Sequence, residues 1–500
     1  MSEDRRIREI IVAGNGLVGL SAAASLKRRI PGATVTVVGG SPGDDALAER
    51  IGTMLPSVTA FNHDMGLDEA DVFRMTGASF RLGTLFDGWS GAAPAYVHAY
   101  GEYGQKFGTT SFHLHWARQA RMGKVAPFDA FAPAAMLARA GRFVHPQGET
   151  GSPLASYEYG VNLDPVRYRE MMRAYARHLG VIERPGAITD VRLASDTGFV
   201  EALLLEDGTE IGGHLFVDCT GPAALVRSRL DDRFEDWGQW LPCDRVLFAG
   251  GPGLADPPPL DKAVAHAAGW RWESASRAHG SHGLVYSSAH LSDYRAERVL
   301  RGASASDPGA PVSIRQGRRS QPWFRNCVAI GDSAVSIEPL EWANLHLAHS
   351  ALDRLVAKMP DRDCAPVETW DYNRETAAEA ERVRDFLVLH YVTADRPKDD
   401  FWRDVAAVPP PASLAHSLGL FCERGRLPQY EEETFTKHSW LAVLLGQGML
   451  PRRVDPVIDL FPPDQSERVM LQLRDHLAAM APTLPTNGAY LRQLPPGAQR

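Results

Sequence analysis

A glycine pattern near the start of the chain is the first feature whose spacing points to chemistry. Residues 14–19 read Gly-Asn-Gly-Leu-Val-Gly, which is G-x-G-x-x-G between an apolar run at 9–13 and a helical pattern at 17–29. The first glycine permits a tight turn, the second lets a pyrophosphate approach the backbone, and the third lets the helix pack on the strand. The helix N-terminus then faces the phosphates. We therefore expect a dinucleotide site built from Gly14, Gly16, Leu17, Val18 and Gly19.

One element of that site is missing. The second strand, expected at 33–38, is normally followed by an acidic residue that binds the ribose. Here Gly39, Gly40 and Ser41 follow it, and the nearest acids are Asp44 and Glu49. The sequence therefore predicts an unusual contact to the adenosine.

Two later segments favour a flavin over a nicotinamide cofactor. Residues 217–221 (V-D-C-T-G) and 329–334 (A-I-G-D-S-A) resemble the later fingerprints of flavoproteins of the glutathione-reductase class. The resemblance implies that the aspartate of the G-D pair binds the ribityl chain. A second G-x-G-x-x-G at a strand–helix junction is missing, so we expect reduced FAD to come from a separate flavin reductase, a transient partner. The cofactor-binding residues expected here are Asp218, Gly221, Gly331 and Asp332.

Candidate catalytic groups lie elsewhere in the chain. Glu341 follows Pro339 and Leu340 in an apolar stretch, where burying a carboxylate is costly without a purpose. His98 lies in an aromatic-rich segment, where a histidine is more often simply hydrogen-bonded than catalytic. His113 and His115 have no third ligand beside them, and the five scattered cysteines include no C-x-x-C, so we predict no metal site.

Composition excludes several classes of function. The net charge of −8 and the isoelectric point near 6.1 give no general attraction for nucleic acid or for anionic membranes. No apolar run approaches the roughly 20 residues that cross a bilayer, and the start of the chain shows no secretory pattern. With its odd, scattered cysteines the chain is expected to be cytoplasmic and soluble.

The predicted fold class is α/β (α+β), a Rossmann-like FAD-binding lobe of the glutathione-reductase type with a second, mainly helical substrate lobe. Five hundred residues exceed what a single core usually serves. We expect the first lobe at 1–345, with inserted pocket-forming loops at about 85–160, and the second at 346–500, ending in a proline-rich tail. Further strands are predicted at 188–193, 200–205, 214–220 and 328–330, with a hairpin turn at 206–209 and helices at 163–179, 345–358 and 376–392.

Seven further segments, spread over nearly the whole chain, resemble the FADH2-dependent tryptophan halogenase family. They are F-R-L-G at 80–83, H-A-Y-G at 98–101, L-P-C-D-R at 241–245, W-R-W at 270–272, E-P-L-E at 338–341, F-W-R at 401–403 and G-Q-G-M-L-P at 446–451. The resemblance implies a tunnel that carries hypohalous acid from the flavin to an aromatic substrate. That substrate is a small indole-like or tryptophan-like molecule, or an aromatic residue on a peptide. Chloride or bromide is the implied co-substrate, and a homodimer is left open.

The resemblance also implies roles for individual residues. Glu341 takes the place of the family's catalytic glutamate, Arg81 stands where the family has an essential lysine, and His98 lies in the segment that lines the substrate pocket. Ala343 and Asn344 fall in the loop that helps to hold the halide beside the cofactor. The expected substrate contacts are His98, Tyr100, Trp342, Trp402 and Trp440.

The departures from the family pattern fall on the chemistry. Arg81 stays protonated and is a poor nucleophile, unlike a lysine. The family's S-T-G after E-P-L-E is Trp342-Ala343-Asn344, and its W-x-W-x-I-P motif ends in Glu-Ser-Ala at 273–275. Three functions therefore stay open at this point: halogenation, direct oxygenation with Glu341 as general base, and a non-catalytic flavin-binding paralogue or partner subunit.

Overall fold

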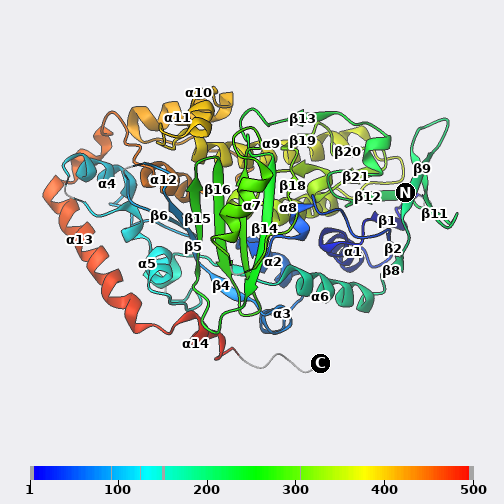
Figure 1. Ribbon diagram of the computed structural model, residues 1–500, viewed down its shortest axis with the longest axis horizontal. Helices are drawn as coiled ribbons and strands as arrows, with labels where there is room; N and C mark the ends of the chain where they lie inside the picture. Colours follow the sequence, from blue (N-terminus) through cyan, green and yellow to red (C-terminus); the bar gives the residue numbers. More distant parts are fainter. Residues whose placement is uncertain (1–4, 92, 124, 149–151, 305, 495–500) are drawn as a thin grey trace.

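The computed structural model of the chain describes residues 5–91, 93–123, 125–148, 152–304 and 306–494. Figure 1 shows three regions along the long axis: a sheet with α1 at one end, a second sheet in the centre, and a group of helices at the other end. The last residues of the predicted proline-rich tail, 495–500, lie outside the described residues.

The first sheet is the predicted parallel one. Its strand order is β20-β21-β12-β1-β2-β8, and β1 pairs in parallel with both β2 and β12. The central strands β1, β2 and β12 are buried on both faces, which is why they are rich in apolar residues. The edge strand β20 departs from the parallel pattern and pairs antiparallel with β21. The helix α1 connects β1 to β2 as expected. The bounds are β1 Glu9–Ala13, α1 Leu17–Arg29, β2 Thr34–Val38, β8 Ile182–Arg184, β12 Leu215–Asp218, β20 Trp323–Phe324 and β21 Cys327–Ala329.

The second sheet was not predicted as a unit. It has seven strands in the order β18-β14-β17-β16-β15-β5-β6, antiparallel except where β15 pairs with β5. On its β16–β17 pair Trp272 lies opposite Gly283, and a Cβ on Gly283 would collide with the indole ring. The bounds are β5 Gly83–Asp87, β6 Tyr96–Ala99, β14 Arg245–Pro252, β15 Leu260–His266, β16 Gly269–Ala275, β17 His279–Tyr286 and β18 Val312–Ser313.

Three small sheets complete the strands. The predicted hairpin is confirmed, because β10 pairs antiparallel with β9 and with β11. The other two have the orders β13-β19-β22 and β3-β7-β4. The bounds are β3 Thr53–Met54, β4 Ser79–Arg81, β7 Gly160–Asn162, β9 Ile188–Leu193, β10 Val200–Leu205, β11 Glu210–Gly212, β13 Phe234–Asp236, β19 Gly317–Arg319 and β22 Val335–Ser336.

The three long predicted helices are confirmed. The helix α6 begins at Pro165, after Asp164 accepts hydrogen bonds from the N–H groups of Val166 and Arg167 as an N-cap. The helix α9 begins ten residues before the expected position 376, because Pro366 at its first turn is already compatible with helix. The bounds are α2 Ser57–Asp64, α3 Glu69–Thr76, α6 Pro165–His178, α7 Asp293–Arg301, α8 Asn344–Ala357, α9 Pro366–Val392, α10 Asp400–Ala407, α11 Ala412–Arg424, α12 Lys437–Gly446, α13 Pro463–Met480 and α14 Asn487–Leu491.

Residues 85–160, expected as pocket-forming loops, do line the two cavities described for the site, but they also hold two helices that were not predicted. This region holds β6, α4 (Phe112–Arg121) and α5 (Pro133–Arg139). Both helices are short, and α5 is buried on nearly every side, so α5 does not show the amphipathic period that reveals a surface helix. They pack with α13 in the helical region on the left of Figure 1.

The contacts at residue 345 bear on the two expected lobes. The helix α8 directly follows this position but packs against α1 of the first sheet, whereas α4 from the 85–160 region packs against α13. Segments from each side of the predicted boundary therefore lie in both regions. The division into lobes at residue 345 stays a prediction.

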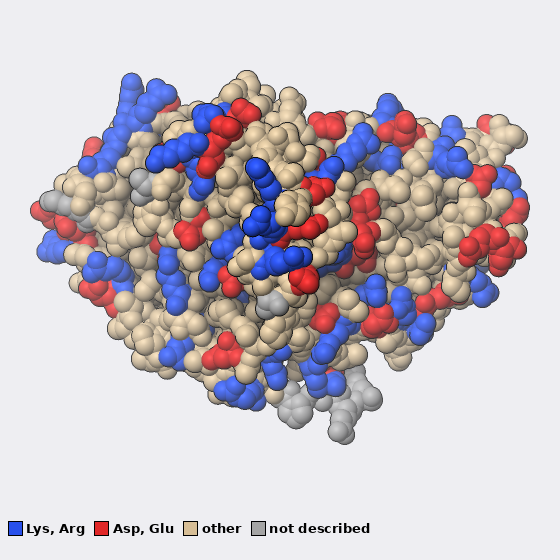
Figure 2. Space-filling view, in the orientation of Figure 1, with Lys and Arg blue, Asp and Glu red and all other residues tan. Residues whose placement is uncertain are grey.

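The surface carries mixed charge on the face in view. Figure 2 shows Lys and Arg side chains interspersed with Asp and Glu, without a broad patch of one sign. Among the described helices, no single one is long and apolar enough to cross a membrane. The bent pair α10 and α11, at 92°, meets the length and composition requirement only when both are counted together.

The fit of Trp272 over Gly283 gives a test of the central sheet. Replacing Gly283→Val should cost about 1–3 kcal/mol, because the added methyl groups force the indole out of its position. The melting temperature of the purified protein measures this. Gly419→Ala in α11 is the control: nothing lies within 4 Å of that position, and alanine favours helix. An unchanged melting temperature for Gly283→Val would contradict the described packing.

Candidate functional site

The glycine pattern forms a tight connection between β1 and α1. Gly14 has φ +102°, and a Cβ there would collide with the carbonyl oxygen of Cys219 on the neighbouring strand segment. A Cβ on Gly19 would collide with the carbonyl oxygen of Gly14. The first and third glycines are therefore required by helix–strand packing, as the sequence predicts.

A carboxylate occupies the N-terminus of α1. The N–H groups of Leu17 and Val18 donate to the two oxygens of Glu49, with the Val18 bond at 3.0 Å. Glu49 was noted in the sequence only as one of the acids nearest to the missing ribose ligand. The structure instead brings Glu49 to the place where a dinucleotide site binds phosphate. The glycine turn and the first N–H groups of α1 form the cofactor cradle, and this cradle binds an anion, the Glu49 carboxylate.

The third fingerprint lies beside the first. Gly331 has φ +68°, and a Cβ there would lie 3.0 Å from a methyl group of Val18. The next residue, Asp332, accepts a hydrogen bond from the Ala48 N–H at 2.9 Å, while its other oxygen is buried with no partner among the described residues. Burial raises the pKa of Asp332 to about 7, and the charge of Glu49 adds to the shift.

The aspartate of the second fingerprint, at 217–221, stabilises a turn. Asp218 accepts hydrogen bonds from Thr220 through one oxygen and from the N–H groups of Val226 and Arg227 through the other, at 2.6–3.0 Å. Its carboxylate therefore holds the turn after β12 instead of reaching the cradle.

Asn344 donates to the Ile337 carbonyl at 2.9 Å, but its side-chain oxygen has no partner among the described residues. Ala343, just before it, is completely buried.

The predicted catalytic carboxylate lies between two histidines. One oxygen of Glu341 is 2.8 Å from Nδ1 of His98 on β6 and 3.0 Å from Nε2 of His390 on α9. All three side chains are buried. Burial alone would raise the pKa of Glu341, but the two histidines outweigh it and hold that pKa below its usual range. Burial lowers the pKa of His390.

Two features of this cluster point to a ligand. The second oxygen of Glu341 and Nε2 of His98 are buried without a hydrogen-bond partner among the described residues, and such orphaned groups are rare in native structures. The backbone is also strained: Glu341 and Trp342 have φ of 61° and 64°, a region that non-glycine residues rarely adopt. A polar, strained, buried site of this kind is typical of a binding or catalytic centre.

Arg81 is held by hydrogen bonds on every side. It is completely buried at the end of β4 and forms an ion pair with Asp261, which in turn accepts from Asn162 at 2.7 Å. Its remaining guanidinium nitrogens donate to the Tyr100 hydroxyl and, at 2.6 Å, to the Thr84 hydroxyl. Arg81 is therefore a fixed positive charge and not a mobile one.

Trp342 fills the space between Arg81 and the altered W-R-W segment. Its ring centroid is 6.3 Å from that of Trp270 and 6.0 Å from that of Trp272, in edge-to-face geometry. The indole N–H lies 3.4 Å from the Thr84 hydroxyl, and the Arg81 guanidinium carbon is 5.9 Å from the ring. Two of the departures seen in the sequence, Arg81 and Trp342, thus meet beside the two tryptophans that precede the third.

The other predicted substrate residues lie apart from one another. The Tyr100 hydroxyl accepts a hydrogen bond from Arg81, and the same residue lines a cavity of about 540 Å³. Trp402 stacks on Tyr391 and donates to the His266 carbonyl at 2.8 Å, in an aromatic core. Trp440 packs edge-on against Phe386, which also contacts His98. Trp89 likewise contacts both Trp402 and His390, so each of the two tryptophans is one residue removed from the Glu341 cluster.

A cavity of about 540 Å³ lies next to the cluster. Tyr100 and Phe435 line it, and both rings contact the His98 ring, at centroid distances of 6.0 and 6.4 Å. Leu55, Pro56 and Ser57 form another part of its wall. A single aromatic ring system fits in a space of this size.

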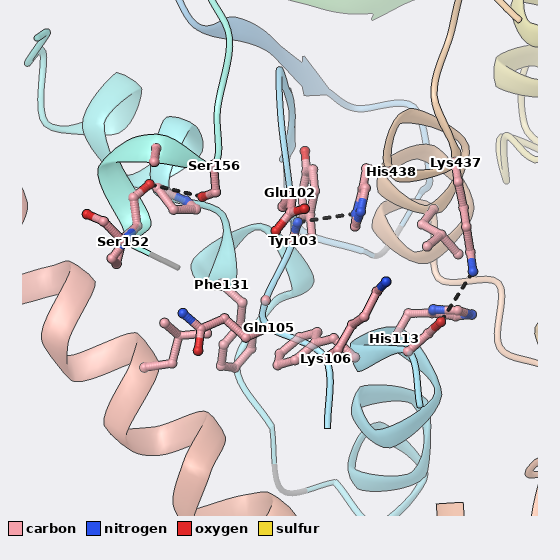
Figure 3. Close-up of a pocket in the computed structure, with 18 of the residues that line it drawn as sticks. Glu102, Tyr103, Gln105, Lys106, His113, Phe131, Ser152, Ser156, Lys437 and His438 are labelled. Atoms are coloured by element: carbon pink, nitrogen blue, oxygen red, sulfur yellow. Dashed lines mark hydrogen bonds between the residues drawn. The ribbon is translucent and has the colours of Figure 1, made fainter. Parts of the chain in front are cut away.

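A larger cavity of about 870 Å³ lies behind the same segments (Figure 3). Residues 100–101 and 436 line the smaller cavity, while Tyr103, Lys437 and His438 line the larger one. Figure 3 shows the Tyr103 backbone N–H bonded to the His438 ring, and this bond measures 3.3 Å. One wall therefore separates two cavities near the candidate site.

Sequence reasoning missed three residues of this site. His390 lies on a helix that was predicted, but no motif marks it. Asp261 precedes a lysine on β15 in an ordinary strand pattern. Glu49 was noted only as a nearby acid, and no contact was predicted for it. Each acts through a partner more than 30 positions away in the chain, and a single sequence carries no signal for such pairs.

Together, a dinucleotide-type cradle at the carboxyl edge of a parallel sheet and a buried carboxylate–histidine cluster define a mixed α/β enzyme. Residues 9–463 match the family described as tryptophan halogenase. The chain therefore belongs to the tryptophan halogenase family, whose members are flavin-dependent enzymes.

Individual relatives cover the whole chain. BrvH, a flavin-dependent halogenase from Brevundimonas sp. BAL3, is 37% identical, with a TM-score of 0.92 over 98% of this chain and 100% of that one. Xcc4156, a flavin-dependent halogenase from Xanthomonas campestris, is 31% identical, with a TM-score of 0.91 over 99% of both chains. The tryptophan 6-halogenase SttH from Streptomyces toxytricini is 28% identical over 96% of this chain and 97% of its own length.

The cradle fits the FAD that the family uses. The N–H groups of Leu17 and Val18 hold an anion, the Glu49 carboxylate, where a phosphate would bind, and Asp332 has a buried, unpartnered oxygen. These are the groups that a pyrophosphate and a sugar hydroxyl need.

The ion pair at Arg81 gives a testable prediction. Arg81→Met leaves the Asp261 carboxylate buried without its cation and should lower the free energy of unfolding by about 3–5 kcal/mol. Adding Asp261→Asn removes the uncompensated charge, so the double variant should recover part of this loss. Denaturant unfolding of both variants, with Asp261→Asn alone as control, measures the coupling. Equal losses in the single and double variants would contradict a buried ion pair.

The raised pKa of Asp332 predicts a pH-dependent stability. Between about pH 4 and 7 the folded state binds more protons than the unfolded chain, so the free energy of unfolding falls as pH rises through that window. Asp332→Asn should remove this loss, so its advantage over the parent should grow from pH 4 to 7 and then stay constant. Melting temperatures without cofactor measure it. Asp44→Asn, whose side chain is 91% exposed, should show no such pH trend.

Proposed function

We propose that this protein uses reduced FAD and O2 to halogenate an aromatic substrate whose ring N–H is held at Glu341. The observation that carries this proposal is the pair of orphaned polar atoms, Glu341 Oε2 and His98 Nε2, buried behind the Tyr100 and Phe435 rings that line the smaller cavity. A carboxylate oxygen only accepts, so it selects a donor such as the N–H of an indole.

The low pKa of Glu341 defines what the carboxylate does. A strongly held carboxylate is a weak base, so its work is orientation and charge stabilisation more than proton abstraction. Its negative charge stabilises the positive charge that develops on the ring when an electrophile adds to it. His98 and His390 fix its position, so that no reorganisation is needed during the reaction.

The residues at the cradle hold the cofactor. The N–H groups of Leu17 and Val18 would bind the pyrophosphate, and Asp332 a hydroxyl of the sugar or ribityl chain. Bound reduced FAD would supply, together with O2 and chloride or bromide, the electrophilic halogen. We infer that a separate flavin reductase delivers the reduced cofactor.

The substrate class follows from the relatives and the cavities. SttH halogenates tryptophan, as its name states, and the 540 Å³ cavity has room for an indole ring. The adjoining cavity of about 870 Å³ offers space for a larger molecule. We therefore infer an indole-bearing substrate, either free or as a tryptophan side chain within a peptide.

Direct oxygenation is the second candidate, and one observation favours it. Arg81 stands where the family has its lysine, and its donors are committed to Asp261, Tyr100 and Thr84. A guanidinium does not react with an oxidant as the amine of a lysine does. Without that amine, oxygen transfer that bypasses the halide becomes the competing reaction.

One assay separates the two candidates. The protein is supplied with FAD, a flavin reductase, NADH and air, with or without chloride or bromide, and indole and tryptophan products are analysed by mass. We expect products that gain a halogen only when the halide is present. Glu341→Gln should reduce their formation by about 10²–10⁴-fold, because the charge that stabilises the substrate is lost.

Other outcomes overturn the proposal. An oxygenated product that forms equally without halide would replace halogenation with oxygenation. Bound FAD with no product from either substrate would favour a non-catalytic role. Arg81→Lys in the same assay tests whether this position alone limits halogen transfer.

A further inference from the structure

Residues 42–50 lie across the cofactor cradle. Glu49 receives the N–H groups that begin α1, and the Ala48 N–H donates to Asp332. At the second fingerprint, a Cβ on Gly221 would lie 3.2 Å from Pro42 and 3.1 Å from Ala46. One short segment therefore touches all three fingerprints of the site.

Glu49 lies at the position that a phosphate needs. A Cβ built on Gly16 would be 2.5 Å from both carboxylate oxygens of Glu49. Gly16 is the residue whose missing side chain lets a pyrophosphate approach the backbone. The carboxylate fills that approach, and the same N–H groups cannot serve both anions at once.

Electrostatics agree with this geometry. The N-terminus of a helix carries a partial positive charge that favours any anion, and α1 provides it here. Burial raises the pKa of Glu49, while the N–H groups of Val18 and Leu17 and the charge of Arg169 act in the opposite direction. The positive field that holds Glu49 is the field available to a phosphate after Glu49 leaves.

We propose that Glu49 is a built-in competitor of the phosphates of FAD. The cofactor binds after the carboxylate leaves α1, so that Glu49 sets the affinity for any ligand that places a phosphate on these N–H groups. This inference rests on the proposed use of FAD. It adds a residue that determines cofactor affinity and that belongs to none of the glycine or aspartate fingerprints.

The test is to change Glu49 and titrate three ligands. Glu49→Gln keeps the size of the side chain and removes its charge, and Glu49→Ala removes the contact. Dissociation constants are measured by calorimetry for FAD, for ADP, which has the phosphates without the flavin, and for riboflavin, which has the flavin without phosphate. We expect both variants to bind FAD and ADP about 2- to 30-fold more tightly, the range for loss of one helix-capping group. Riboflavin binding should not change.

A matched control is available in the same segment. Asp44→Asn removes an equal charge from a side chain that is 91% exposed and forms an ion pair with Arg50. It should leave the affinity for FAD and ADP unchanged. Inorganic pyrophosphate should also raise the melting temperature of Glu49→Gln more than that of the parent, which checks the folded state of the variant.

Each remaining outcome is decisive. Equal FAD and ADP affinities in parent and variants would overturn the role of Glu49 while leaving the use of FAD intact. A gain for riboflavin as large as that for FAD would show that the segment acts by general exclusion and not by competition with phosphate. No FAD binding by any of the proteins would overturn both this inference and the proposed function.

Discussion

A charged carboxylate with almost no exposure to solvent, Glu341, has to be met by partners from distant parts of the chain. An ion buried alone costs several kcal/mol, so it persists only where the fold supplies compensating groups. His98 comes from the edge of the central sheet and His390 from the long helix α9. The buried charge of Glu341 therefore depends on the packing of the central sheet against α9, which brings the two histidines together. The left-handed backbone at 341–342 shows that the chain bends to bring the carboxylate there.

Much of the first sheet could be predicted from the sequence, because its signals are local. The strand at 9–13, the helix at 17–29 and the hairpin around 206–209 each follow from periodicity and turn residues within one short window. The helix α5 could not be predicted, because a short helix buried on nearly all sides carries no amphipathic pattern. The seven-stranded sheet was not predicted for a related reason: β14 pairs with β17 and β15 pairs with β5 although these strands are far apart in the chain, and a register is a property of pairs.

In the candidate site, too, the residues with a local sequence signal were predicted and those defined by a distant partner were not. Glu341, His98 and Arg81 were found because each lies in a recognisable run of residues. His390 and Asp261 were not found, since their meaning comes only from the partner that the fold places beside them. Glu49 could not be predicted either, because nothing in the residues around it indicates that it contacts the glycine pattern 30 residues earlier in the chain.

The departures from the family pattern are best understood as one packed unit. The Thr84 hydroxyl accepts a hydrogen bond from Arg81 and lies 3.4 Å from the indole N–H of Trp342, so one oxygen serves both unusual residues. Trp342 in turn packs against Trp270 and Trp272, next to the part of the W-x-W motif that has changed. A small residue at 342 would leave a space beside Arg81, and a lysine at 81 would leave Thr84 and Tyr100 without a planar donor. The changes therefore depend on one another, and the chemistry of this site follows from the set and not from any one substitution.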